Sequence, residues 1–79
     1  MEKKQKFLID LKEGQRATII SISGGRGAAQ RLADLGLTPE TKIKVISAAP
    51  FAGPVEIEVR GSKLALGQGI ASKIIVEPI

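Results

Sequence analysis

The sequence predicts a mostly β protein: a small closed or half-closed barrel of about five short strands, with one short helix at its flank. Residues 55–60 alternate between apolar and polar side chains, which is the pattern of a half-buried strand. Other segments rich in β-branched residues are separated by glycine and proline turns. Closing such strands into a barrel removes the sheet edges that would otherwise pair with other chains.

The expected elements follow in chain order. We expect an irregular strand at 7–11 and strands at 16–23, 41–48, 55–60, 63–66 and 73–77, with Pro78 ending the last. Gly61-Ser62 is predicted to form a two-residue hairpin turn, and residues 67–72 a loop or a single helical turn. The predicted core consists of Ile20, Ile22, Ile43, Val45, Val55, Ile57, Val59, Leu64, Leu66, Ile74 and Val76.

Residues 24–45 hold the predicted helix, which follows a glycine-rich entry and leads through a proline turn into a strand. Its apolar face is expected to carry Ala28, Ala29, Leu32 and Leu35, and its polar face Gln30, Arg31 and Asp34. Gly36 should end the helix in the left-handed conformation, which would let Leu37 pack back on Leu32. A helix this short is unstable alone in water, so the strands must hold it by packing.

Length and composition limit the class of protein. The 79 residues suit one small domain, 1–79, with residues 1–6 expected to form a frayed basic tail. There is no cysteine, hence no disulfide framework. No apolar run approaches the roughly 18 residues that a membrane span needs, and the basic N-terminus lacks the apolar stretch of a signal peptide.

Several short motifs follow one another along nearly the whole chain, and their order and spacing are more specific than any one of them. They are Leu8 to Leu11 with Gly14; Arg31-Leu32 and Leu35-Gly36-Leu37 with Pro39; Ile43-Lys44-Val45; Pro50 with Gly53-Pro54; Ile57 and Val59; Leu64; and Ala71 with Ile74 and Val76. This series resembles the FeoA family, the small cytosolic component of bacterial ferrous-iron uptake. The resemblance implies an SH3-like barrel with a helical flank.

The resemblance also implies a partner and a location. The partner would be the membrane transporter FeoB with its cytosolic GTP-binding domain, and the protein would be cytoplasmic, recruited by that partner to the inner face of the membrane. One departure is Glu40, where the family's turn usually carries glycine after the proline. Because glutamate does not favour positive φ, we expect a type I rather than a type II turn at residues 38–41.

The composition lacks the side chains that most often serve in catalysis and metal binding. There is no histidine and no cysteine, and ferrous iron usually needs imidazole, thiolate or several carboxylates. The eight acidic residues are scattered, with Glu56 and Glu58 as the closest pair, on the outer face of one strand. The serines have no histidine to activate them, and nothing in the spacing favours a serine–lysine pair. We therefore predict no enzyme activity, no metal site and no cofactor.

Six residues are candidates for binding the partner: Arg26, Arg31, Leu32, Leu35, Pro50 and Phe51. Phe51 is the sharpest, because aromatic side chains often anchor interfaces, although it could equally plug the open end of the barrel. For Leu32 and Leu35 a role in the core is the stronger interpretation, because their helix must bury its apolar face. Arg26, in the glycine loop, or Arg31 could act on GTP bound by the partner.

The sequence thus predicts a non-catalytic adaptor that docks on the transporter's GTP-binding region and self-associates weakly at most. The alternative from another class is a small basic barrel that binds nucleic acid, which the net charge of +4 suits. Two phenylalanines and no tyrosine or tryptophan leave few stacking platforms for bases. The barrel is also similar to the C-terminal domain of DtxR-type iron-dependent repressors, but the sequence shows no helix-turn-helix segment, so we favour a free-standing protein.

Overall fold

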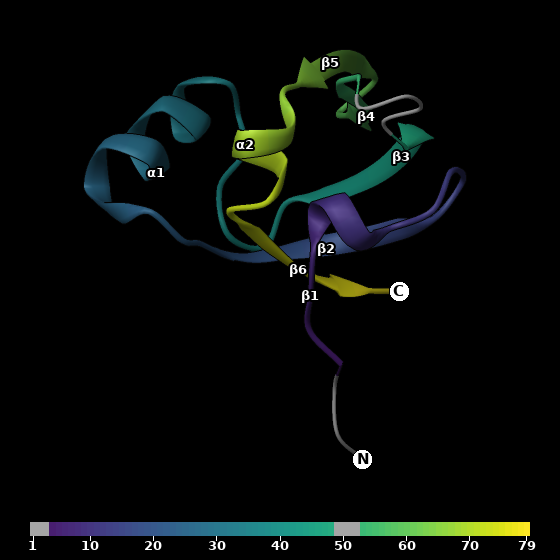
Figure 1. Cartoon of the computed structure of the whole chain (residues 1–79), viewed down its shortest axis with the longest axis horizontal. Helices are drawn as coiled ribbons and strands as arrows, with labels where there is room; N and C mark the ends of the chain where they lie inside the picture. The colour runs from purple at the N-terminus through teal and green to yellow at the C-terminus, as the bar shows by residue number, and fades with distance from the viewer. Residues whose placement is uncertain (1–3, 49–52) are drawn as a thin grey trace.

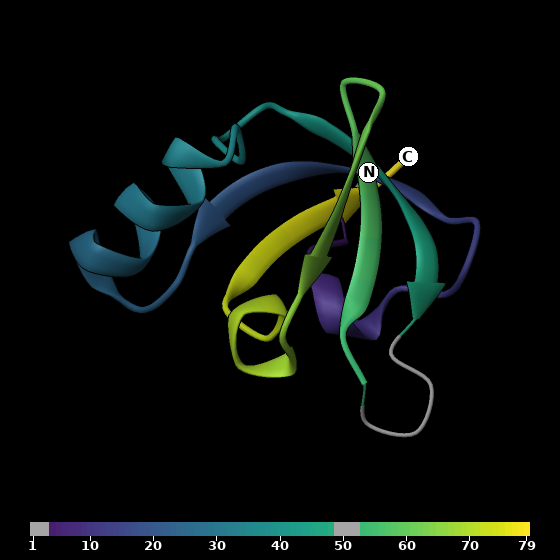
Figure 2. The same cartoon turned by 90° about the horizontal axis from the view of Figure 1, so that it is seen from above.

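The fold is a strongly curved antiparallel sheet with a helix beside it (Figures 1 and 2). The computed structural model describes residues 4–48 and 53–79, and within them six strands pair in the order β1-β6-β2-β3-β4-β5. The strands are β1 (Lys6–Phe7), β2 (Arg16–Ile22), β3 (Lys42–Ala48), β4 (Val55–Val59), β5 (Ser62–Leu66) and β6 (Ile74–Pro78). The helical elements are the 3-10 helix η1 (Leu8–Asp10), α1 (Gly25–Asp34) and the single turn α2 (Gln68–Ala71). No helix in these two ranges is long and apolar enough to cross a membrane.

The hydrophobic core lies inside the curved sheet and confirms most of the predicted core. Eight predicted residues are buried: Ile43, Val45, Val55, Ile57, Val59, Leu66, Ile74 and Val76. Leu64 and Ile22 pack against this cluster while staying partly exposed. Seven further buried hydrophobic residues were not on the predicted list: Leu8, Leu11, Ala17, Ile19, Leu32, Leu37 and Ala71. Most of these lie outside the clearly alternating strands, where periodicity gives little information about burial.

The inward face of β2 differs from the prediction. Ala17 and Ile19 point into the core, whereas Ile20 is only partly buried and lies outside the core cluster. The register against β6 shifts between Ile19 and Ser21, so Ile20 is an inserted residue in this strand. Because β2 carries apolar residues on both faces, alternation alone could not show which face is inward. The register shift at Ile20 also changes which residues face inward partway along the strand.

The N-terminal segment also departs from the prediction. Instead of one irregular strand at 7–11, a two-residue strand β1 is followed by η1, and the N–H of Leu11 donates to the carbonyl of Leu8 (3.1 Å). Lys6, which was expected to lie in the tail, pairs with Val76 of β6. This turn of 3-10 helix is what carries both Leu8 and Leu11 into the core.

The end of α1 follows the prediction closely. Gly36 has a φ of +87°, and its N–H donates to the carbonyl of Ala33 (2.9 Å). The N–H of Leu37 donates to the carbonyl of Leu32 (2.8 Å), so the two bonds together form a Schellman motif. Both leucines are buried. The motif therefore anchors the C-terminal end of α1 to the sheet.

Two turn predictions were wrong, and both errors involve a residue with positive φ. Glu40 has a φ of +74° at the third position of the turn at residues 38–41, as in a type II turn rather than the expected type I. The β4–β5 hairpin turn is Arg60-Gly61 rather than Gly61-Ser62, because Val59 pairs with Ser62. The φ angles of Arg60 and Gly61 are +51° and +80°, which fit the type I′ turn that matches strand twist.

Candidate functional site

A groove separates α1 from the end of β2 and from the turn that leads into β3. Its volume is about 410 Å³. We call it the α1 groove, and its lining residues are Ser21, Ile22, Arg26, Ala29, Gln30, Ala33, Leu37, Thr38 and Pro39. Its lining combines apolar side chains from Ile22, Ala29, Ala33, Leu37 and Pro39 with polar ones from Ser21, Arg26, Gln30 and Thr38.

The helical wall of the groove follows from the spacing of four residues. Arg26, Ala29, Gln30 and Ala33 stand at positions i, i+3, i+4 and i+7, which share one face of a helix. The two alanines are the reason the space stays open, because larger side chains at these positions would fill it. Within α1 the amide of Gln30 donates to Asp34 Oδ1 (2.9 Å), which steadies the rim of this wall.

The opposite wall is held by hydrogen bonds around the turn. The hydroxyls of Thr38 and Thr41 share a hydrogen bond of 3.1 Å, and the N–H of Thr41 donates to the carbonyl of Thr38 (3.2 Å). Pro39, which follows Thr38 in this turn, also lines the groove. An apolar side chain entering the groove would meet a preformed wall, which lowers the entropy cost of binding.

The six predicted partner-binding residues do not come together at this groove. Of the four on or beside the helix, Arg26 is exposed and lines it, whereas Arg31 is exposed but not part of the lining. Leu32 is only 2% exposed and belongs to the core, while Leu35 is 50% exposed at the helix end. Leu32 is therefore not available to a partner on the folded surface. Pro50 and Phe51 lie outside the described residues, and their role stays a prediction.

Ala29, Gln30, Ala33 and Pro39 were not predicted as groove residues. Ala29 was expected on the apolar face of the helix and Gln30 on the polar face, and the groove lies where these two faces meet. The i, i+3, i+4, i+7 spacing from Arg26 was visible in the sequence. What could not be seen was which boundary of the helix would face the turn at residues 38–39.

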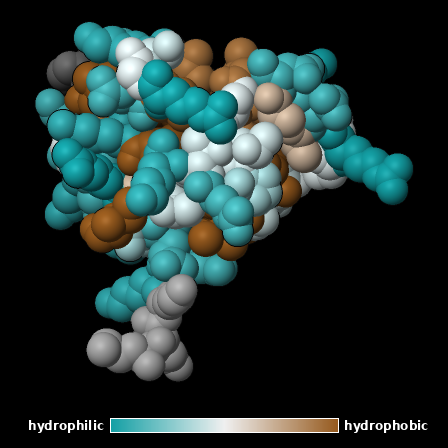
Figure 3. Space-filling model, turned by 180° about the vertical axis from the view of Figure 1, so that it is seen from behind, coloured by the Kyte–Doolittle hydropathy of each residue, from teal (hydrophilic) through white to brown (hydrophobic). Residues whose placement is uncertain are grey.

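The rest of the surface offers no comparable apolar site among the described residues. The large exposed hydrophobic side chains come from separate elements: Phe7, Leu35, Ile70 and Ile79. Seen from behind, hydrophilic residues cover most of the molecule and the hydrophobic ones form separate small patches (Figure 3). Within residues 4–48 and 53–79, no group of three or more histidine, cysteine, aspartate or glutamate side chains is placed to hold a metal ion.

The curved antiparallel sheet and its flanking helix define the chain as an SH3-like barrel. Residues 7–78 match the model of the FeoA domain, and the chain belongs to the FeoA family. A candidate Fe(2+) transport protein A of Methanocaldococcus jannaschii is 44% identical over 66 residues, which cover 84% of this chain and 78% of that protein.

Solved structures agree with this assignment. The crystal structure of an iron uptake regulatory protein (FeoA) superposes with a TM-score of 0.89 at 32% identity, covering 96% of this chain and all of that one. A manganese-dependent transcriptional repressor shares the fold at 20% identity with a TM-score of 0.88, and there the match covers all of this chain but 44% of the repressor. The barrel therefore occurs both on its own and as a part of larger repressors.

Proposed function

We propose that this protein is a non-catalytic adaptor of ferrous-iron uptake, which docks through the α1 groove on the cytosolic GTP-binding region of an FeoB-type transporter. The observation that carries the proposal is the groove itself, an apolar hollow with a preformed wall and an exposed arginine, in a chain of the FeoA family. The names of its relatives, an Fe(2+) transport protein A and an iron uptake regulatory protein, support the link to iron transport.

The chemistry of the groove specifies what it would hold. Ala29, Ala33 and Leu37 offer apolar contact to one or two aliphatic or aromatic side chains of the partner. Arg26, in the first turn of α1, would form a charge-assisted hydrogen bond with a carboxylate beside that apolar segment. Aromatic and arginine side chains in such contacts usually carry most of the binding energy of an interface.

The decisive experiment compares two arginines of one helix. We expect Arg26→Ala to weaken binding to the purified cytosolic region of the transporter by about 1–2 kcal/mol, because it removes a groove contact. Arg31→Ala is the matched control, since Arg31 is equally exposed on α1 but does not line the groove, and its effect should stay below about 0.5 kcal/mol. Isothermal titration calorimetry measures both.

A second variant tests the hollow rather than the charge. Ala29→Leu keeps a strong helix former in place and fills the groove, so it should abolish binding while the melting temperature stays within a few degrees. Equal binding by Ala29→Leu and the unmutated protein would show that the groove is not the docking site. In that case Pro50 and Phe51 become the first alternative.

A further inference from the structure

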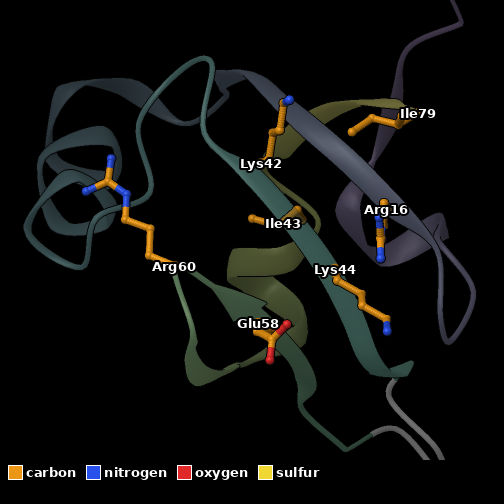
Figure 4. A pocket seen from close by; sticks show the side chains of 7 residues that line it. All are labelled: Arg16, Lys42, Ile43, Lys44, Glu58, Arg60 and Ile79. Carbon is orange, nitrogen blue, oxygen red and sulfur yellow. The ribbon is translucent and has the colours of Figure 1, made fainter.

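A second hollow lies on the outer face of the sheet, and among the described residues it shares no lining residue with the α1 groove. Its volume is about 380 Å³, and it is lined by Arg16, Lys42, Ile43, Lys44, Glu58, Arg60 and Ile79. The four cationic side chains project outward from β2, β3 and the β4–β5 turn, with Glu58 of β4 among them (Figure 4). We call this surface the basic face.

The register of the sheet brings cations against one another on this face. Arg16 stands directly opposite Lys44 in the β2–β3 pair, and like charges in that position destabilise a sheet. Across β3 and β4, Lys44 stands opposite Glu58, whose other neighbour is Lys63 of β5. Glu58, the carboxylate among the described lining residues, is therefore flanked by two lysines. Glu40 lines a neighbouring hollow together with Lys42 and Arg60, so the four cations of the face still outnumber the carboxylates beside them.

Backbone strain is concentrated at one end of the same face. Among residues 4–48 and 53–79, Glu40 and Arg60 are the non-glycine residues with positive φ, a conformation that side chains with a Cβ rarely adopt. Both line an adjoining hollow of about 500 Å³, which shares Lys42 and Arg60 with the basic face. Asparagine or glycine would suit the turn better than Arg60 does, which makes its guanidinium a candidate functional group.

We propose that the basic face lies against the anionic lipid headgroups of the membrane that holds the transporter. All four cations are exposed and none lies in a closed pocket, so the face suits an extended anionic surface better than one small anion. Ile79, 73% exposed at the same hollow, adds the apolar contact that such surfaces accept. Among the described residues that line the hollow none is aromatic, so they do not offer the stacking that single-stranded nucleic acid needs.

This inference rests on the proposed function for the choice of membrane. It adds to that function an orientation of the barrel at the membrane surface. Lipid contact through β2 and β3 would hold the barrel at the membrane surface beside its partner, where a weak docking contact gains from proximity. The test uses lipid vesicles without any transporter. A failure to bind lipid and a failure to dock would therefore be separate results.

The experiment is cosedimentation of the full chain with vesicles of phosphatidylcholine alone or with about a third phosphatidylglycerol. We expect binding only to the anionic vesicles, lost as salt is raised, because screening weakens such attraction. Lys42→Gln/Arg60→Asn should lower the partition coefficient about 30-fold, since each cation near an anionic surface contributes severalfold. Asparagine is chosen because it tolerates the left-handed conformation of Arg60.

The matched control is Arg31→Gln/Lys73→Gln, which removes the same charge from residues that do not line the face. It should lower the partition coefficient less than about threefold. If the first variant fails to fold by circular dichroism, Lys42→Gln/Lys44→Gln replaces it. The proposal would be overturned if the test and control variants lost binding equally, or if the protein bound both kinds of vesicle equally. Displacement of the protein from anionic vesicles by micromolar GTP or inorganic phosphate would also overturn it. Preferential binding to RNA at the same salt would overturn it too, in favour of nucleic acid.

Discussion

At the scale of single residues, Glu40 shows how a backbone network overrides a side-chain preference. Its N–H donates to the carbonyl of Ile19 (2.7 Å), and the N–H of Ile19 donates to the carbonyl of Thr41 (2.9 Å). These two bonds extend the β2–β3 pairing into the turn. Each contributes about 1 kcal/mol, which together offsets the roughly 1–2 kcal/mol that a residue with a Cβ loses at positive φ.

We predict that Glu40→Gly stabilises the protein. Glycine relieves the strain at φ +74° but costs about 0.5–1 kcal/mol of chain entropy, so the net gain should be about 0.5–1 kcal/mol, or a few degrees in melting temperature. Thermal unfolding by circular dichroism measures it. Glu56→Gly is the control in an extended strand, where the entropy cost acts without relief and stability should fall. A lower melting temperature for Glu40→Gly would mean that its side chain makes a contact worth more than the strain.

At the scale of elements, α1 shows what a sequence pattern can and cannot predict. Its end at Gly36 and the return of Leu37 to Leu32 were predicted, because a left-handed cap depends on a few neighbouring residues. The wall of the α1 groove was not predicted, because it depends on how the helix is rotated against β2. In β2 the inward face could not be predicted from the sequence, because isoleucines lie on both faces and the register shifts within the strand.

The two leucines of the helix end provide a test of this packing. Leu32→Ala should cost about 2–5 kcal/mol of unfolding free energy, because it leaves a cavity in the core beneath α1. Leu35→Ala removes a side chain that is half exposed and should cost about 0.5 kcal/mol or less. Urea denaturation of both variants compares them directly. Similar losses for the two would show that α1 is rotated from the described orientation.

At the scale of the whole molecule, the sequence predicted the architecture better than the site. Clean alternation in β4 and β-branched residues in β3 and β6 suffice to place these strands within a residue or two. A barrel follows because so short a chain can cover its apolar strands only by curving the sheet. The α1 groove and the basic face each need residues from separate elements, Arg26 with Pro39 and Arg16 with Arg60, and only the tertiary fold brings these together.

Metal binding is also a question for the whole molecule, because a site needs several ligands close together. The sequence has no histidine or cysteine, so a site for ferrous iron would have to consist of carboxylates. The closest pair, Glu56 and Glu58, projects from β4 with both side chains exposed. Glu58 stands between Lys44 and Lys63 in the sheet, and the two ammonium groups would repel a divalent cation from it.

We therefore predict that the isolated protein binds Fe²⁺ no more tightly than millimolar, as expected for a single exposed carboxylate pair without nitrogen or sulfur ligands. Anaerobic calorimetric titration with Fe²⁺ is the measurement, and Glu56→Gln/Glu58→Gln is the control for any weak heat that appears. A stoichiometric site of micromolar affinity or better would contradict the prediction. If that site survived the double substitution, carboxylates elsewhere in the chain would have to supply its ligands, and iron binding would become part of the proposed function.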